Sequence, residues 1–251
     1  MRKLLILFYA IILTTGVMAQ TTETAKKGMP NIPGTFLFDY GSNFLSTHNH
    51  DTLKTKIFNS VSLNAYYIYE FKINESGQFT FNPGIGVGID KIAFKDDRGL
   101  FSVIDDVSGN RETVVMPLTT AFTDGKSFKK SLMAMTYIDV PLEFRYHANP
   151  DDRNRSFKVA VGGRIGVLVN QKTKFKYTTI DDASGNSQDM KVKYHQNYDI
   201  NRFRFGTTLR VGIGFFNVFY YHNFSQIFNA DSGPDGTKVS NYTLGLTLSG
   251  F

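Results

Sequence analysis

Residues 136–150 read TYIDVPLEFRYHANP, and the order of their side chains decides the fold class. From Ile138 to Tyr146 every second residue is apolar, and Asp139, Pro141, Glu143 and Arg145 stand between these residues. Such a period of two is typical of a β-strand whose two faces meet different surroundings. The apolar members are Ile138, Val140, Leu142, Phe144 and Tyr146, and the polar face carries Asp139, Glu143 and Arg145.

The same alternation recurs along most of the chain, and no stretch of helical periodicity interrupts it. Several of the alternating segments are longer than the five or six residues usual for a globular strand, and a tilted membrane-crossing strand needs about 9–11. We predict eight strands, at roughly 34–45, 57–73, 78–94, 131–147, 156–178, 193–215, 218–227 and 239–251.

The connections between these segments are of two kinds, which alternate along the chain. Short connections are expected at 74–77, 148–155 and 216–217, and longer ones at 46–56, 95–130, 179–192 and 228–238. The longest of them should contain a hairpin of its own. Short turns at one end and long loops at the other are the pattern of an outer-membrane barrel.

The composition of the two faces indicates which one looks inward. One face is aromatic or branched, whereas the other mixes glycine, small polar groups and charges. Small side chains suit the inside of a narrow barrel, where they must share space. A soluble periplasmic lipocalin-like barrel carrying an apolar ligand would reverse the faces, and it remains the alternative. The residues that we expect to face lipid include Val61, Leu63, Val87, Val140, Val161, Ile165 and Val211.

We therefore predict an all-β fold: a closed up-and-down antiparallel transmembrane β-barrel of about eight strands, with short periplasmic turns and long extracellular loops. Aromatic residues beside the short turns should form a girdle at one membrane interface. Pro141 cannot donate to a β-ladder, so a bulge or a missing bond is expected there. The predicted girdle comprises Phe71, Phe79, Phe81, Phe144, Tyr146, Phe157 and Phe215.

Charged residues on the inward face predict a filled lumen, because buried charges persist only when they are paired and hydrogen-bonded. If His147 pairs with Ser156, Asp139 lies opposite Arg164 on the neighbouring strand. The predicted charge network comprises Glu70, Asp90, Asp139, Glu143, Arg145, Arg164, Arg204 and Arg210.

The start of the chain has the features of a secretory signal peptide at 1–19, with a basic Arg2-Lys3 and an apolar run that ends at Leu13. We expect a short periplasmic segment at 20–33 and the barrel at 34–251. Without Arg2 and Lys3 there are 26 basic and 22 acidic residues, a net charge of +4 that gives no reason to expect nucleic acid as a partner. The chain has no Cys, which excludes disulfides and a lipid anchor on Cys.

No motif predicts an enzyme, and we expect no catalytic residue, cofactor or metal site. His48-Asn49-His50-Asp51 is best interpreted as a polar loop tip, because a metal would need a third rigid ligand. IDDVSGN at 104–110 and IDDASGN at 180–186 are near-copies that suit hairpin tips. His195 and Asp199 lie four residues apart on a predicted strand, too far to bond directly.

The stretch YIDVPLEFRY, followed by a polar turn and FKVAVGGRIGVLVN, resembles the PorT-like outer-membrane β-barrel proteins of Bacteroidota. The likeness covers about 131–170. It implies a small barrel in the outer membrane, and some members of that family are implicated in type IX secretion. The C-terminal strand departs from the usual barrel-assembly pattern, because its apolar positions, which include Leu244, Leu246 and Leu248, are one residue out of step with Phe251.

Three functional hypotheses follow from these observations. The first is a non-enzymatic integral outer-membrane protein with a side-chain-filled lumen, in contact with outer-membrane lipid, that serves a structural or accessory role, including secretion, with an envelope or secretion protein as partner. The second is a surface adhesin or ligand binder that acts through its long extracellular loops. The third is the soluble periplasmic barrel.

Overall fold

The computed structural model describes residues 34–47, 53–104, 109, 111–122, 127–153, 155–180, 187–229, 233–234 and 237–250. The predicted signal peptide, the segment 20–33 and the loop tip around His50 lie outside these residues, as does most of each near-copy of the IDD motif. None of the helices in the described part of the chain is both long and apolar enough to cross a membrane.

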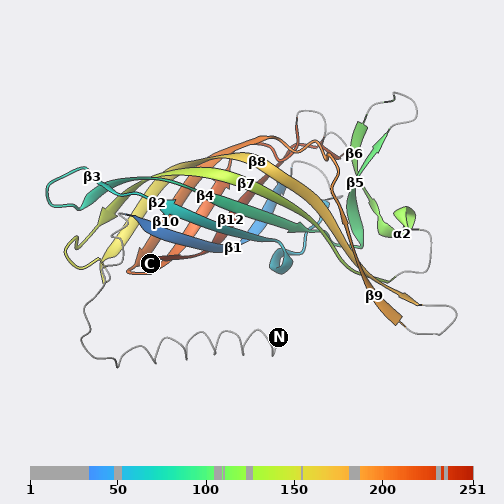
Figure 1. Ribbon diagram of the computed structural model, residues 1–251, viewed down its shortest axis with the longest axis horizontal. Helices are drawn as coiled ribbons and strands as arrows, with labels where there is room; N and C mark the ends of the chain where they lie inside the picture. The colour runs from blue at the N-terminus through green and yellow to red at the C-terminus, as the bar shows by residue number, and fades with distance from the viewer. Residues whose placement is uncertain are drawn as a thin grey trace, which may run out of the picture. The chain divides into compact units, whose positions relative to one another are not determined.

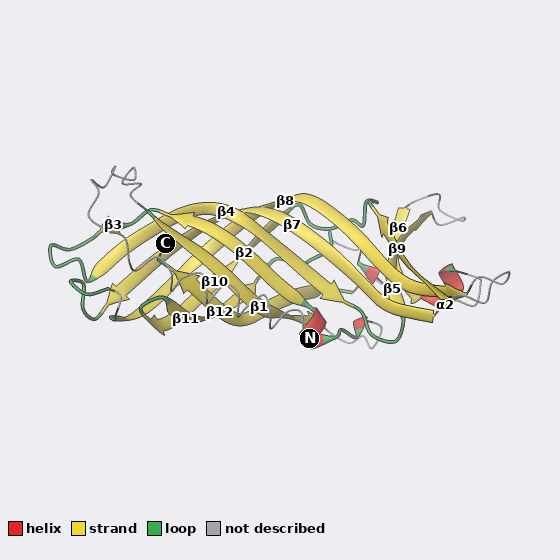
Figure 2. Ribbon diagram, turned by 60° about the horizontal axis from the view of Figure 1, so that its bottom comes forward, coloured by secondary structure: helices red, strands yellow, loops and turns green. Residues whose placement is uncertain are grey.

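The described strands form a closed antiparallel barrel (Figures 1 and 2). Each strand pairs with its neighbours in the order β1, β2, β4, β7, β8, β10, β11 and β12, and pairing of β12 with β1 closes the ring. This confirms the predicted fold of eight strands. They are β1 (Thr35–Thr47), β2 (Val61–Ile68), β4 (Phe79–Ala93), β7 (Ser127–His147), β8 (Phe157–Ile180), β10 (Phe203–Ile213), β11 (Phe216–Asn223) and β12 (Val239–Ser249).

Two of the predicted strands are interrupted. The first begins with a short 3-10 helix, η3 (Ile57–Asn59), and breaks after Ile68 before the two-residue β3 (Phe71–Lys72). The segment predicted at 193–215 contains the last two residues of β9 (Ser187–Tyr194) and all of β10, and most of β9 lies in 179–192, which was predicted as a loop. β9 pairs with the outer part of β8, and β10 pairs with its inner part. At 24 residues, β8 is long enough to need two partners in succession.

The turn between β10 and β11 lies two residues earlier than predicted. Ile213 pairs with Phe216, which leaves Gly214 and Phe215 as a two-residue turn rather than Phe216-Asn217. Gly214 has a φ of +55°, a conformation that glycine adopts without strain. We name the end of the barrel that carries this turn the short-turn end, and the opposite end the long-loop end.

The register of β7 and β8 differs from the prediction by two residues. Asp139 pairs with Gly166 rather than Arg164, and His147 pairs with Lys158 rather than Ser156. The amide of Ala148 donates to the carbonyl of Phe157 at 2.9 Å, so the turn extends one residue further on its second strand than the polar stretch suggests. Because side chains alternate with a period of two, a shift of two leaves the residues of β8 from Phe157 to Leu168 on their predicted faces.

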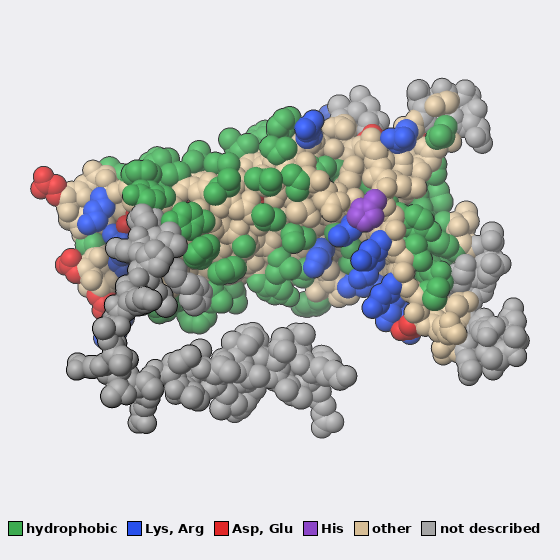
Figure 3. Space-filling model, in the orientation of Figure 1, with side chains coloured by type: hydrophobic (Ala, Val, Ile, Leu, Met, Phe, Trp, Pro, Cys, Tyr) green, Lys and Arg blue, Asp and Glu red, His purple; other side chains and the backbone are tan. Residues whose placement is uncertain are grey.

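The two faces of the barrel are opposite in character. Exposed hydrophobic side chains cover the outside (Figure 3), and buried polar and charged side chains fill the inside. Val61 is half-buried on the outside, and the other six residues predicted to face lipid are exposed there. These six are Leu63, Val87, Val140, Val161, Ile165 and Val211.

Pro141 interrupts a ladder, as its chemistry requires. The pairing of β4 with β7 runs through Pro83↔Leu142 and resumes at Gly86↔Asp139 in the same register, so bonds are missing without a bulge. A Cβ on Gly84 would lie 3.2 Å from Cγ of Pro141, which shows how closely the proline ring covers this gap.

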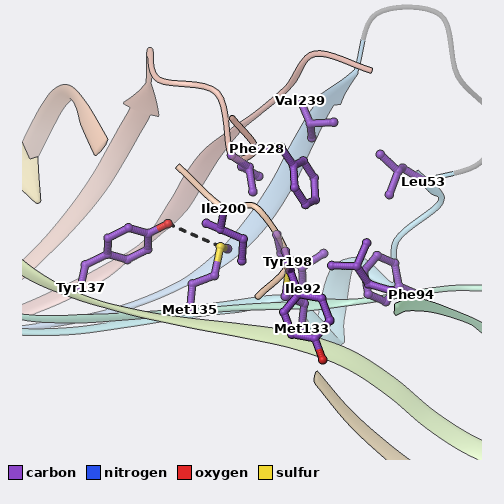
Figure 4. Packing of buried hydrophobic residues seen from close by; sticks show 12 residues of the cluster. Leu53, Ile92, Phe94, Met133, Met135, Tyr137, Tyr198, Ile200, Phe228 and Val239 are labelled. Carbon is purple, nitrogen blue, oxygen red and sulfur yellow. Dashed lines mark hydrogen bonds between the residues drawn. The ribbon is translucent and has the colours of Figure 1, made fainter. Parts of the chain in front are cut away.

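Beyond the barrel wall, the long-loop end carries a second small sheet. The strands β5 (Arg98–Ile104) and β6 (Arg111–Pro117) pair as a hairpin, as predicted within 95–130, and α2 (Leu118–Ala121) follows. Buried hydrophobic side chains pack at this end around Met133, Met135 and Tyr198 (Figure 4). The inside of the barrel is therefore polar along its middle and apolar at the long-loop end.

Candidate functional site

The first group of buried charges surrounds Arg204 on β10. Its Nε lies 2.9 Å from Oδ1 of Asp139, and its Nη2 lies 2.5 Å from Oδ2 of the same carboxylate. Its Nη1 donates to Oδ2 of Asp90 at 2.6 Å. Asn43 completes the set, because its amide donates to the other oxygen of Asp90 at 3.2 Å. Arg204 thus joins strands β4 and β7 across the lumen.

Arg164 on β8 belongs to the same group but contacts the carboxylate less directly. Its guanidinium donates to the hydroxyl of Tyr66, which in turn donates to Oδ2 of Asp139 at 3.1 Å. Its Nη1 is 4.0 Å from that oxygen. The guanidinium also lies over the ring of Tyr221, 3.6 Å from the centroid. Asp139 and Arg164 therefore lie in the same group, as predicted, but the direct ion pair of Asp139 is with Arg204.

The second group surrounds Arg210, further toward the short-turn end of β10. Two of its nitrogens bind the carboxylate of Asp39 at 2.6 and 2.9 Å, and its Nε binds Oε1 of Glu143 at 2.8 Å. Arg145 contacts the other oxygen of Glu143 through Nε at 3.1 Å and Nη2 at 2.8 Å. Thr247 donates to Asp39 at 2.7 Å.

Each group pairs two carboxylates with two guanidinium ions. We name the set made by Asp90, Asp139, Arg164 and Arg204 the upper cluster, and the set made by Asp39, Glu143, Arg145 and Arg210 the lower cluster. All eight side chains are at most 7% exposed. Since charges so buried are tolerated only in well-bonded pairs, the balance of two against two explains how the lumen holds them.

Asp39 was not among the predicted residues, although it belongs to the lower cluster, and the predicted Glu70 lies outside both clusters. Asp39 shares a face with Gly41 and Asn43 in the first strand, so the alternation was a sufficient signal for it. Glu70 lies in the break after β2, where it pairs with Arg153 of the β7–β8 turn and has Oε2 3.9 Å from Nε2 of the buried His147, at the short-turn end of the lumen.

Glycines on the inward face make room for the upper cluster. A Cβ on Gly166 would lie 2.1 Å from Oδ1 of Asp139, and one on Gly88 would lie 2.3 Å from Nη2 of Arg204. The glycine-rich strands therefore supply the space that the guanidinium groups occupy. Beside the lower cluster, a cavity of about 10 Å³ remains, enough for about one water molecule.

The predicted aromatic girdle lies on the outside of the barrel at its short-turn end. Phe79 packs on Tyr146 with 5.2 Å between the ring centroids, and Phe81 packs on Phe144 at 5.0 Å. The remaining members, Phe71, Phe157 and Phe215, are exposed at the same end. Aromatic pairs also lie nearer the long-loop end, which the sequence reasoning did not single out: Phe44 with Tyr242, and Phe205 with Phe224.

The remaining candidate residues do not form a reactive group. Asp199 accepts a hydrogen bond from Thr113 at 3.4 Å, and His195 is exposed. Among the residues that the structure describes, no three His, Cys, Asp or Glu side chains are close enough to hold a metal ion. The arrangement as a whole is that of an integral barrel protein of the outer membrane, with lipid outside and a charge-filled lumen.

Comparison with known proteins agrees with this class. The chain belongs to the family described as outer membrane protein beta-barrel domain, whose model matches residues 18–229. No curated protein matches the chain.

Two solved structures are similar to it at low identity. One is Ail, the attachment invasion locus protein of Yersinia pestis, with 14% identity, a TM-score of 0.32 and coverage of 86% of this chain and 97% of that one. The other is the toluene transporter TbuX of Ralstonia pickettii, with 9% identity, a TM-score of 0.20 and coverage of 86% and 89%. Likenesses this weak carry no inference about function.

Proposed function

We propose that this protein acts by contact at its long-loop end and is neither a solute channel nor an enzyme. The observation that carries this proposal is the pair of neutral clusters that fills the lumen. Arg204 and Arg210 each reach across the barrel to carboxylates on other strands. A strand number of eight leaves an interior that side chains fill, so no open path is expected.

The long-loop end offers a surface suited to contact. We name it the platform: β5, β6, α2, β9 and the outer parts of β7 and β8. The ring of Phe175 stacks on Phe101 with 5.2 Å between centroids and meets Phe122 edge-on at 5.8 Å, which fixes the hairpin to the barrel. Exposed apolar side chains remain on it, including Ile104 at 68% and Met190 at 42%. Loops on a rigid scaffold are where binding usually resides.

The partner that we favour is a protein of the same cell envelope. The resemblance of 131–170 to PorT-like proteins supports an accessory role in an envelope assembly, including secretion. The second candidate is an adhesin whose partner lies on another surface, and the exposed Ile104 and Met190 favour it equally. In both cases the long-loop end faces outward, which agrees with the predicted signal peptide and with short turns in the periplasm.

Electrical recording tests whether the lumen is closed. The purified protein, inserted in a planar bilayer, should give no discrete conductance steps. Arg210→Ala removes a guanidinium from the lower cluster and should be the variant most prone to leak. Discrete steps from the wild-type protein would refute the filled lumen.

Photo-crosslinking from the platform tests contact and separates the two partners. A photoreactive amino acid at Ile104 on intact cells should capture one envelope protein of the same cell, whereas the same group at Val161 on the lipid face should capture lipid only. Capture from Ile104 only after a second cell type is added would favour the adhesin. No adduct under either condition would contradict action through the platform.

A further inference from the structure

A β-bulge on β8 changes the character of the outer face at one level. Tyr137 pairs with Leu168 and Thr136 pairs with Asn170, so Val169 is an extra residue without a partner. Val169 and Asn170 are both exposed. Before the bulge the odd-numbered residues of β8 point outward, and after it the even-numbered ones do. The bulge therefore ends the apolar outer face of this strand.

Lysine side chains occupy the outer face beyond the bulge. We name as the lysine face the residues Lys91, Lys130, Lys172, Lys174, Lys176, Lys191 and Lys193, from β4, β7, β8 and β9. Lys174 lies directly opposite Lys193, and Lys176 lies opposite both Lys191 and Lys130. Figure 3 shows Lys and Arg side chains gathered over the outer ends of β8 and β9, next to the hydrophobic belt.

Like charges directly opposite each other destabilise a sheet, so this arrangement calls for a counter-charge. The acid within it, Asp189, is already engaged by Lys129 at 2.6 Å and Lys176 at 2.9 Å. Burial and the charges of Lys191 and Lys193 lower the pKa of Lys174. Among the described residues, no carboxylate lies within salt-bridge distance of Lys172, Lys174, Lys191 or Lys193.

A groove lies next to the lysine face, because its lining residues Gln171 and His195 are close in sequence to Lys172 and Lys193. It has a volume of about 480 Å³ and lies where β8 has left β10 and not yet met β9. Its lining combines apolar with polar side chains: Leu168, Val169, Asn170, Gln171, His195, Gln196, Ile200 and Arg202. A molecule bound here would have its apolar part in the membrane and its polar part beside the lysines.

We propose that the lysine face and this groove bind the phosphate-bearing sugar head group of an outer-leaflet glycolipid of the lipid A type. Clustered lysines just outside the hydrocarbon region attract anionic lipid, and lysine ammonium groups bind phosphate as point charges. A nucleic acid or an acidic protein would meet the same charges, but neither would use the apolar wall at Val169. The inference rests on the proposed function in one respect, that the long-loop end faces the outer leaflet.

The test uses the purified full-length protein in neutral detergent, with lipid A, phosphatidylcholine and inorganic phosphate as separate probes, and native mass spectrometry to measure retained lipid. Wild-type protein should retain lipid A in preference to phosphatidylcholine, and millimolar phosphate should not displace it. The variant Lys174→Gln/Lys193→Gln should bind lipid A about 30-fold more weakly, since each lysine near a membrane surface contributes about fivefold.

A matched control removes the same charge elsewhere. Lys72→Gln/Lys238→Gln changes two exposed lysines outside the lysine face and should keep the wild-type affinity within about twofold. Without lipid, Lys174→Gln/Lys193→Gln should unfold in urea at the wild-type midpoint or above it, because a repulsive pair has gone.

Three results would overturn the proposal. They are equal retention of phosphatidylcholine, full displacement by inorganic phosphate, and unchanged lipid A binding by Lys174→Gln/Lys193→Gln. Because both ends of the barrel are accessible in detergent, these results do not depend on topology in the cell. An inverted topology would be revealed separately, by labelling on intact cells.

Discussion

Removal of Arg204 from the upper cluster should be among the costliest single changes in the barrel. Its side chain is 2% exposed and makes three charge-assisted bonds, two to Asp139 and one to Asp90. Breaking a buried pair by removing one partner costs about 3–5 kcal/mol. With an m-value of about 2 kcal/mol/M in urea, Arg204→Gln should lower the unfolding midpoint by roughly 2 M.

The double variant Arg204→Gln/Asp139→Asn should lose less than the sum of its parts. Residues in direct contact show coupling energies of about 0.5–3 kcal/mol, and this pair, with bonds of 2.5 and 2.9 Å, should lie at the upper end. The double-mutant cycle of Arg164→Gln with Asp139→Asn is the control. The nearest nitrogen of Arg164 is 4.0 Å from Asp139, so its coupling to Asp139→Asn should be clearly smaller.

Equilibrium unfolding in urea, in the same lipid or detergent for every variant, measures both cycles. Heat-modifiable migration on gels checks that each variant folds. Additive effects of Arg204→Gln and Asp139→Asn within about 0.5 kcal/mol would refute the direct pair. If Asp139 had a larger coupling energy with Arg164 than with Arg204, Arg164 would be its direct partner, as the sequence alone suggested.

Further predictions concern the lipid face, the packing of the lumen and the topology. Val161→Arg should cost about 2–4 kcal/mol and impair assembly, whereas Ala160→Ser on the lumen face should not; normal folding of Val161→Arg would mean that the faces are inverted. Gly166→Ala should destabilise, because its Cβ would lie 2.1 Å from a lumen carboxylate, whereas Gly163→Ala should be tolerated with its nearest atom at 3.6 Å; equal urea midpoints would contradict this. An epitope tag after Gly109 should bind antibody on intact cells, and labelling only after permeabilisation would place the long loops in the periplasm.

The sequence was enough to predict which side chains of each strand point into the lumen and which point outward, because successive side chains of a strand lie on opposite faces. Ile138 to Tyr146 and Phe157 to Val167 keep their predicted sides even though the register of β7 and β8 was wrong by two residues. Register depends on the length of the turn at 148–156. The alternation carries no information about that length, so the direct partner of Asp139 could not be assigned.

Breaks in the alternation were harder to predict from the sequence. Both β9 and β10 alternate, and nothing in the residues between them shows that each meets a different part of β8. The bulge at Val169 shifts the phase of β8 by one residue and turns Lys172 outward. Asp39, by contrast, could have been predicted, because the alternation around it already indicated both its strand and its inward face.

Oxygen and nickel-chelate accessibility of spin labels along β8 test the account most directly. The chain contains no Cys, so a single Cys at each site is labelled without a background. In lipid vesicles, labels at Val161 and Ile165 should respond to oxygen and be protected from the chelate. Labels at Lys172 and Lys174 should respond to the chelate. Chelate access at Val161 and Ile165 equal to that at Lys174 would contradict a barrel whose outer face lies in lipid up to the bulge.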